Sequence, residues 1–217
     1  MKKTAFTLAE VLITLGIIGV VAALTMPALI TKYQKQAAVI KVKKFYSTMN
    51  QAIKLSEVEN GSANEWNVPA GHASYQDTLD FYNMYLAKYI KAIKEIKPSP
   101  YDSDKLCIYM SDGTLFCMGI WAGVDVQFYT SEQCLNAYAN DPSNPRFKRC
   151  SFTFGFIKTT GDTSTKYVLE PYSAGSWDGT REGLLNNAVY GCLGSTGSYC
   201  AKLIQWDGWE IKDDYPW

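Results

Sequence analysis

The amino-acid sequence predicts an α+β fold in which one long N-terminal helix packs against a small antiparallel β-sheet. Three observations predict this class. Apolar residues near the N-terminus recur at helical spacing, and several later segments alternate or pair as short strands. All six cysteines follow the predicted helix, which indicates a disulfide-stapled C-terminal region.

The predicted helix begins with an uncharged apolar segment, residues 11–30. About 20 apolar residues are enough to cross roughly 30 Å of hydrocarbon. Glu10 stands directly before this segment, and Lys2 and Lys3 precede it. A carboxylate in hydrocarbon costs about 2.5–3.5 kcal/mol on insertion scales, so its position indicates a function.

The helix is predicted to continue beyond the apolar segment, over residues 6–59, and to end at Asn60-Gly61. It would be about 80 Å long. Its first half is apolar all round, whereas its second half is amphipathic and needs a packed partner on one face. The apolar stripe of that second half is Ala38, Val42, Phe45, Met49 and Ile53.

Three residues modify the apolar half of the helix. Pro27 removes a backbone hydrogen bond and is expected to kink or loosen the helix near Ala23. Gly16 and Gly19 lower local helix stability and permit neighbouring helices to approach closely.

The order of a short basic leader, a small residue, Phe-Thr-Leu-Ala-Glu and a long apolar helix resembles the type IV prepilin signature. That family includes type IV pilins and the pseudopilins of type II secretion. The resemblance implies cleavage after Ala5 by a prepilin peptidase and N-methylation of Phe6, with Glu10 as the fifth residue of the mature chain. The family usually has glycine where this chain has Ala5. Gly19 and Pro27 extend the match, which is specific over residues 2–30.

The resemblance further implies a pilin-like layout: residues 1–5 form the leader, residues 6–30 the transmembrane and filament-core segment of the long helix, and residues 60–217 the globular domain. It implies a filament subunit of a type IV pilus or a type II secretion pseudopilus. The subunit would wait in the inner membrane and then enter a periplasmic or cell-surface filament. Its expected partners are copies of itself, the prepilin peptidase, the inner-membrane assembly machinery and the lipid bilayer. In the filament, Glu10 would pair with the methylated amine of Phe6 on a neighbouring subunit.

Other interpretations remain open. A Sec signal peptide would have a basic start, an apolar stretch and a small-x-small cleavage site such as residues 21–23 or 26–28, although Glu10 argues against it. Alternative functions are a minor or tip pilin that acts as an adhesin or binding module, and a membrane-anchored domain that never polymerises.

A second helix is predicted from Ser74, its candidate N-cap, to about Ile96, before Pro98 and Pro100. Residues 151–158 and 167–170 are predicted strands.

A β-hairpin is predicted from residues 106–110 and 114–120. A three-residue loop ending at Gly113 sets Cys107 opposite Cys117, within disulfide range, whereas a two-residue turn would leave the cysteines on opposite faces. The register set by the three-residue loop also places six apolar side chains on one face of the hairpin, which should cover the long helix. That face comprises Leu106, Ile108, Met110, Phe116, Met118 and Ile120.

The other two disulfides are predicted from proximity along the chain. Cys134 is expected to pair with Cys150, and Cys192 with Cys200, because each pair closes a loop-rich segment.

The C-terminal region is predicted to contain mostly loop over residues 175–197, with a turn of helix around Leu184. Residues 202–206 and 209–212 flank an Asp-Gly pair and predict a second hairpin.

The sequence lacks the residues that several classes of function require. Formal charge is balanced and no dense basic patch occurs, so nucleic-acid binding is not predicted. His72 is the single histidine, and no Ser-His-Asp set, P-loop or H-E-x-x-H motif is present. We therefore expect no enzymatic activity, no catalytic residue and no cofactor.

No metal site is predicted. Calcium is the one alternative, because several aspartates could supply oxygen ligands. Three of them precede glycine, however, and Asp-Gly is mainly turn chemistry. The aspartates are Asp112, Asp178, Asp207, Asp213 and Asp214.

Overall fold

The computed structural model describes residues 7–91, 97–121, 123–141, 144–160, 165–173 and 177–217. The chain falls into two compact units: the N-terminal unit, Met1–Ala37, and the C-terminal unit, Ala38–Trp217. Helix α1 (Leu8–Asn60) contributes residues to both, so the predicted long helix is confirmed.

The N-terminal unit consists of the apolar half of α1. Pro27 lies inside the helix and does not end it, and the hydroxyl of Thr31 donates to the Pro27 carbonyl at 3.0 Å. A Cβ atom added at Gly16 or Gly19 would meet nothing within 4 Å, so both positions are open in the single chain. With a mean hydropathy of 2.3, this stretch is long and apolar enough to serve as a membrane anchor or a signal sequence.

The C-terminal unit is built on a six-stranded sheet in the order β1-β2-β3-β4-β5-β6, with every neighbouring pair antiparallel. Strands that follow one another in sequence are neighbours in the sheet. Short connections join them except between β4 and β5, which are separated by residues 130–150. The strands are β1 (Lys97–Ser99), β2 (Asp102–Tyr109), β3 (Leu115–Ile120), β4 (Val124–Tyr129), β5 (Ser151–Thr160) and β6 (Thr165–Pro171). The strands predicted around residues 106–120, 151–158 and 167–170 are confirmed, whereas β1 and β4 were not predicted.

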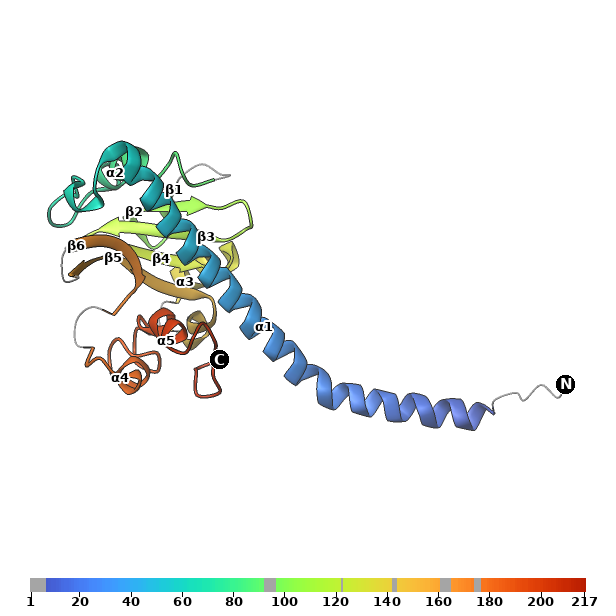
Figure 1. Cartoon of the computed structure of the whole chain (residues 1–217). Coiled ribbons are helices and arrows are strands. Elements are labelled where there is room, and N and C mark those ends of the chain that lie inside the picture. Colours follow the sequence, from blue (N-terminus) through green and yellow to red (C-terminus); the bar gives the residue numbers. More distant parts are fainter. Residues whose placement is uncertain (1–6, 92–96, 122, 142–143, 161–164, 174–176) are drawn as a thin grey trace. The chain divides into compact units, whose positions relative to one another are not determined.

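The second half of α1 crosses one face of the sheet (Figure 1). Its predicted apolar stripe is buried there, which confirms the expected partner. The ring of Phe45 lies 4.5 Å from that of Phe128, 5.2 Å from Phe154 and 5.4 Å from Phe116, measured between centroids. These aromatic contacts from three strands place the main core between α1 and the sheet.

Polar contacts join α1 to the edge strand β6. The side-chain amide of Asn50 donates to the Leu169 carbonyl at 2.9 Å and accepts from the Leu169 N–H at 3.2 Å. Next to it, the Tyr46 hydroxyl donates to Glu170 at 2.8 Å. The helix therefore satisfies backbone groups that an edge strand would otherwise expose.

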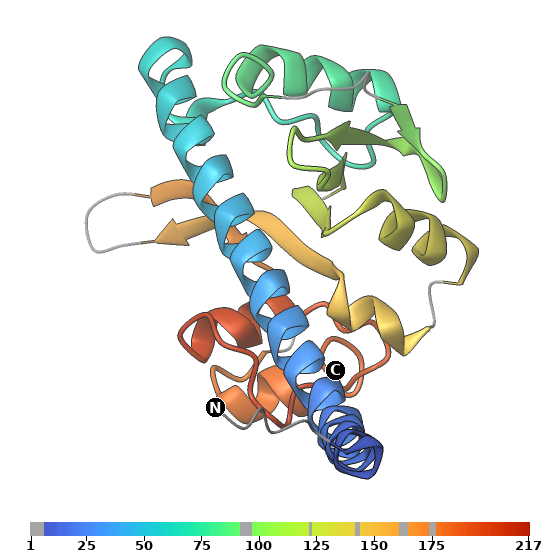
Figure 2. The same cartoon turned by 90° about the vertical axis from the view of Figure 1, so that its right-hand side faces the viewer.

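Helix α3 (Glu132–Asn140) covers the opposite side of the sheet from α1 (Figure 2). A second apolar cluster lies there and includes Cys107, Cys117, Tyr129 and Leu135. The sheet is therefore buried on both faces, with the disulfide of the first hairpin on the α3 side.

The first hairpin has the predicted register. Cys107 stands opposite Cys117, and the Met110 N–H donates to the Thr114 carbonyl at 2.9 Å across a three-residue loop. Gly113 has φ 80°, the left-handed backbone that glycine tolerates. The disulfide joins Cα atoms 4.0 Å apart, and the predicted apolar face packs into the main core.

The two remaining disulfides also match the predictions. Cys134 pairs with Cys150, with Cα atoms 6.1 Å apart, and Cys192 pairs with Cys200 at 4.6 Å. The first bond joins α3 to the end of the short 3-10 helix η2 (Pro145–Arg149).

The second helix is shorter than predicted. Ser74 caps α2 (Tyr75–Tyr85) through a reciprocal capping box with Asp77, as expected. The continuation to Ile96 is wrong, because the hydrogen bonds change after Tyr85: the Ala87 N–H donates to Tyr82 and the Tyr89 N–H to Leu86. Residues 92–96 lie outside the described residues. A 3-10 turn, η1 (Ala63–Glu65), connects α1 to this region.

The second predicted hairpin is wrong, because residues 200–206 form helix α5 (Cys200–Trp206). Ala201, Leu203 and Ile204 are buried at helical spacing against the main core. Gly208, with φ 78°, follows the end of this helix, and the Trp209 N–H closes it on the Ile204 carbonyl at 2.8 Å. The predicted turn around Leu184 is confirmed as α4 (Arg181–Asn186).

Candidate functional site

The start of α1 is the site that the sequence singles out. Ala5 and Phe6, the predicted cleavage and methylation positions, lie outside the described residues. Glu10 lies in the first turn of α1. Its carboxylate accepts from both the backbone N–H and the hydroxyl of Thr7 at 2.8 Å, and the Glu10 N–H donates to the Thr7 hydroxyl at 3.3 Å.

These reciprocal bonds form a capping box, in which a threonine and a glutamate three residues later satisfy each other's backbone donors. Glu10 therefore has a partner within its own chain and helps to begin the helix. Thr7 was not among the predicted site residues, although the spacing Thr7-Leu8-Ala9-Glu10 carries the signal.

Large apolar side chains project from every side of the helix after Glu10. Leaving such a side chain in water rather than burying it costs about 1.5–3 kcal/mol, so this surface needs lipid or other apolar helices around it. The exposed residues are Val11, Leu12, Ile13, Leu15, Ile17, Ile18, Val20, Val21, Leu24, Met26, Leu29 and Ile30.

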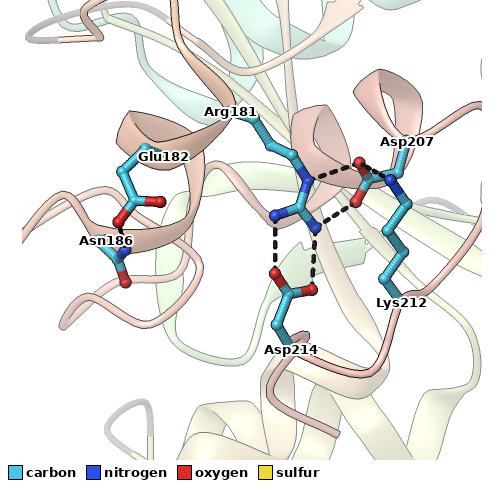
Figure 3. Close-up of polar contacts among 6 residues, drawn as sticks. All are labelled: Arg181, Glu182, Asn186, Asp207, Lys212 and Asp214. Carbon is cyan, nitrogen blue, oxygen red and sulfur yellow. Dashed lines mark hydrogen bonds and ion pairs between the residues drawn. The ribbon is translucent and has the colours of Figure 1, made fainter.

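A network of ion pairs lies in the C-terminal unit (Figure 3). The Arg181 guanidinium, at the start of α4, donates two bonds of 2.7 Å to Asp207 and bonds of 2.7 and 2.9 Å to Asp214. Lys212 lies 3.0 Å from the same Asp207 carboxylate. The Asp207 side chain is only 3% exposed, so Arg181 ties a buried charge and the C-terminal segment to α4.

The ion pairs shift the pKa values of Arg181, Asp207 and Asp214 toward their charged forms. The hydrogen bonds that Arg181 donates to Asp207 and Asp214 raise the pKa of Arg181. Burial raises the pKa of Asp207, but hydrogen bonds from Arg181 and Lys212 outweigh it and leave that pKa below its usual value. The bond from Arg181 likewise lowers the pKa of Asp214. Paired charges of this kind stabilise structure, and none is poised to exchange a proton near neutral pH.

Two of the aspartates considered for calcium, Asp207 and Asp214, meet at the Arg181 guanidinium, and the bonds of Asp112 and Asp178 lie elsewhere. Asp112 accepts from Lys44 at 2.7 Å and from Thr114 at 2.6 Å. Burial opposes the ionised form of Asp112, yet these bonds lower its pKa to about 2. Asp178 accepts from the Thr180 hydroxyl at 2.7 Å. Within the described ranges, no group of three or more His, Cys, Asp or Glu side chains is arranged to hold a metal ion.

Comparison with known proteins gives a family for most of the chain. No curated protein and no solved structure matches it. The family model that does match covers residues 28–217, which comprise the end of the apolar segment and the whole C-terminal unit. The chain therefore belongs to DUF6613, a family of unknown function.

Proposed function

We propose that this protein is a prepilin-type filament subunit of a type IV pilus or a type II secretion pseudopilus. The observation that carries the proposal is the construction of α1. Its first half exposes apolar side chains on all sides behind one carboxylate, Glu10, while its second half buries a single stripe against a sheet. A helix of this kind presents one end to other helices or lipid and holds a folded domain at the other.

In this function the apolar halves of many subunits pack together in the filament core. Their exposed apolar surface supplies the attraction, whereas the single carboxylate limits how neighbouring helices can be offset. An unpaired charge in that core is costly, so the Glu10 carboxylate would pair with the cationic amine of Phe6 on a neighbouring subunit. Glu10 would exchange part of its capping bond to Thr7 for this contact.

The C-terminal unit would form the outer wall of the filament. The sheet of this unit is covered on both faces, and its edge strand β6 is hydrogen-bonded to α1. Together with the three disulfides, these features suit a domain that remains folded outside the cytosol. The role proposed is structural and involves no enzymatic step, cofactor or nucleic acid.

Intact-mass measurement of the protein purified from membranes tests the proposal. The expected mature chain begins at Phe6 and carries one methyl group on its amine. A chain that begins at Leu24 or Leu29 would instead show signal-peptide cleavage. A chain that retains Met1 or Lys2 would show an unprocessed membrane anchor. Either result would overturn the filament proposal.

A further inference from the structure

A cavity of about 720 Å³ opens on the side of the sheet opposite α1. Side chains alternate along a strand. Val126 and Phe128 of β4 belong to the main core with α1, so Gln127 between them points to the other side, where it lines the cavity. The volume lies within the roughly 300–1,000 Å³ typical of small-molecule sites.

Hydrogen bonds fix the floor of the cavity before any ligand enters. Gln127 and Thr153 stand opposite each other in the β4–β5 ladder. The amide nitrogen of Gln127 donates to the Ser151 hydroxyl at 2.5 Å, and the Thr153 hydroxyl donates to the Gln127 amide oxygen at 2.9 Å. These bonds orient an amide and two hydroxyls, so a ligand meets polar groups already in place.

Two disulfide-closed segments form the walls. The segment between Cys134 and Cys150 contributes Tyr138 and Phe147, whose rings lie 5.2 Å apart. The same segment contributes Asn144, whose side-chain oxygen accepts from the Arg146 N–H at 3.0 Å and is thereby oriented.

The opposite wall is the segment between Cys192 and Cys200, where the hydroxyls of Thr196 and Ser198 lie 2.9 Å apart. Lys148 joins the two walls, because its ammonium donates to the Gly194 carbonyl at 2.8 Å. The disulfides and this bond together hold the cavity open at a set width.

The lining selects against several ligand classes. An apolar ligand would remove water from amides and hydroxyls without replacing their hydrogen bonds. A cation would find no carboxylate among the described residues that line the cavity. A polyanion would meet one ammonium, that of Lys148, whose pKa is lowered by burial.

We propose that this cavity binds a saccharide. A sugar presents many hydroxyls that both donate and accept, which suits the amides and hydroxyls of the floor and of the 194–198 wall. Its C–H faces suit the aromatic side chains Tyr138 and Phe147. Such a site would give the C-terminal unit a ligand in addition to its role in filament assembly.

The test uses the full chain in micelles of a detergent that has no sugar headgroup. Glucose, galactose, N-acetylglucosamine, lactose and N-acetylneuraminic acid are titrated separately, and binding is followed by saturation-transfer NMR and calorimetry. At least one saccharide is expected to bind. Asn144→Ala and Thr196→Ala should each weaken its affinity by about tenfold, since each removes one polar partner of the ligand.

A third cavity variant and two controls complete the experiment. Ser198→Trp places a large side chain in the cavity lining, keeps the floor residues Gln127, Ser151 and Thr153, and should abolish binding. Gln51→Ala changes an exposed amide on α1 and should leave the affinity unchanged. Thermal unfolding of every variant establishes that it is folded.

Three results would overturn the proposal. One is no binding by any of these sugars up to about 10 mM, beyond the millimolar range of weak single-site ligands. Another is binding that the cavity variants leave unchanged, and the third is displacement of the sugar by inorganic phosphate at equal concentration. The measurement needs no filament assembly, so its outcome is independent of the processing at Phe6.

Discussion

Glu10 has one observed role and one proposed role, and single substitutions can separate them. In the isolated chain its carboxylate caps α1 through Thr7, whereas in the proposed filament it also selects the offset between neighbouring helices. The first role is local and contributes about 0.5–2 kcal/mol to the helix end. The second, proposed role would decide whether subunits assemble.

Glu10→Leu should therefore leave membrane insertion intact, because the segment becomes more apolar, and should abolish filament assembly. Thr7→Ala is the matched control, because it removes the hydroxyl that bonds both the Glu10 carboxylate and the Glu10 N–H and keeps the carboxylate. It should reduce assembly far less. Quantifying membrane-bound and sheared protein for both variants separates the roles. Equal assembly defects in the two variants would assign Glu10 to capping alone.

Arg181→Met should destabilise the C-terminal unit by about 1–3 kcal/mol at pH 7, because Asp207 would remain buried with Lys212 as its remaining cationic contact. The ion pairs hold the pKa values of Asp207 and Asp214 below their usual value in the folded state. Their stabilisation is therefore present above the usual aspartate pKa of about 3.9 and is lost as the pH falls through the lower folded pKa values. The difference in stability between Arg181→Met and the parent should therefore shrink in acid.

Denaturant midpoints of the full chain in micelles at pH 7 and pH 3 measure that decrease. Arg146→Met, at an exposed arginine of η2, serves as the control and should shift neither midpoint. A difference between Arg181→Met and parent that is equal at both pH values would show that the ion pairs are not its source.

At the scale of elements, two of the three Asp-Gly pairs show how far a short sequence pattern determines local structure. Around Gly113, the flanking strands, the cysteine spacing and the loop length all predicted the same hairpin register, and the structure has that register. Around Gly208 the same dipeptide ends helix α5, because a left-handed glycine suits a helix end as well as a hairpin. The apolar spacing of Ala201, Leu203 and Ile204 is helical, and that burial decides the outcome.

Local patterns predicted α1, the first hairpin and all three disulfides, because each depends on residues close in sequence. The cavity was not predictable in this way. Its floor brings together Gln127 and Thr153 across a strand pair, and one wall comes from residues 194–198. Only the folded sheet and the two closed segments place these residues around one space.

Phe45→Ala should destabilise the packing of α1 on the sheet by about 3–5 kcal/mol, because it empties a buried site between three phenylalanines. Leu55→Ala lies on the same helix at a side chain that is 55% exposed, and should change stability by less than about 0.5 kcal/mol. Chemical denaturation followed by tryptophan fluorescence compares them. Equal effects would contradict the assignment of Phe45 to the core.

For the whole molecule, the abundance of the protein in sheared filaments distinguishes the two kinds of filament subunit. A main subunit should dominate the sheared fraction, and its deletion should remove the filaments. A minor or tip subunit that uses the saccharide cavity would be scarce, and its deletion should remove binding of the cells to immobilised sugar while filaments persist. Quantitative mass spectrometry of the sheared fraction, beside the deletion strain, makes the measurement. Absence of the protein from that fraction would favour a non-polymerising anchor.

The disulfide pattern bears on how the chain matures. The six cysteines bond as three consecutive pairs along the chain, and the partners are 10, 16 and 8 residues apart. If the C-terminal unit crosses a membrane in sequence order behind the anchored helix, the first cysteine of each pair meets its correct partner as the next thiol to emerge. Oxidation in order of emergence produces the native connectivity, so no wrong bridge has to be reshuffled, a step that takes seconds to hours.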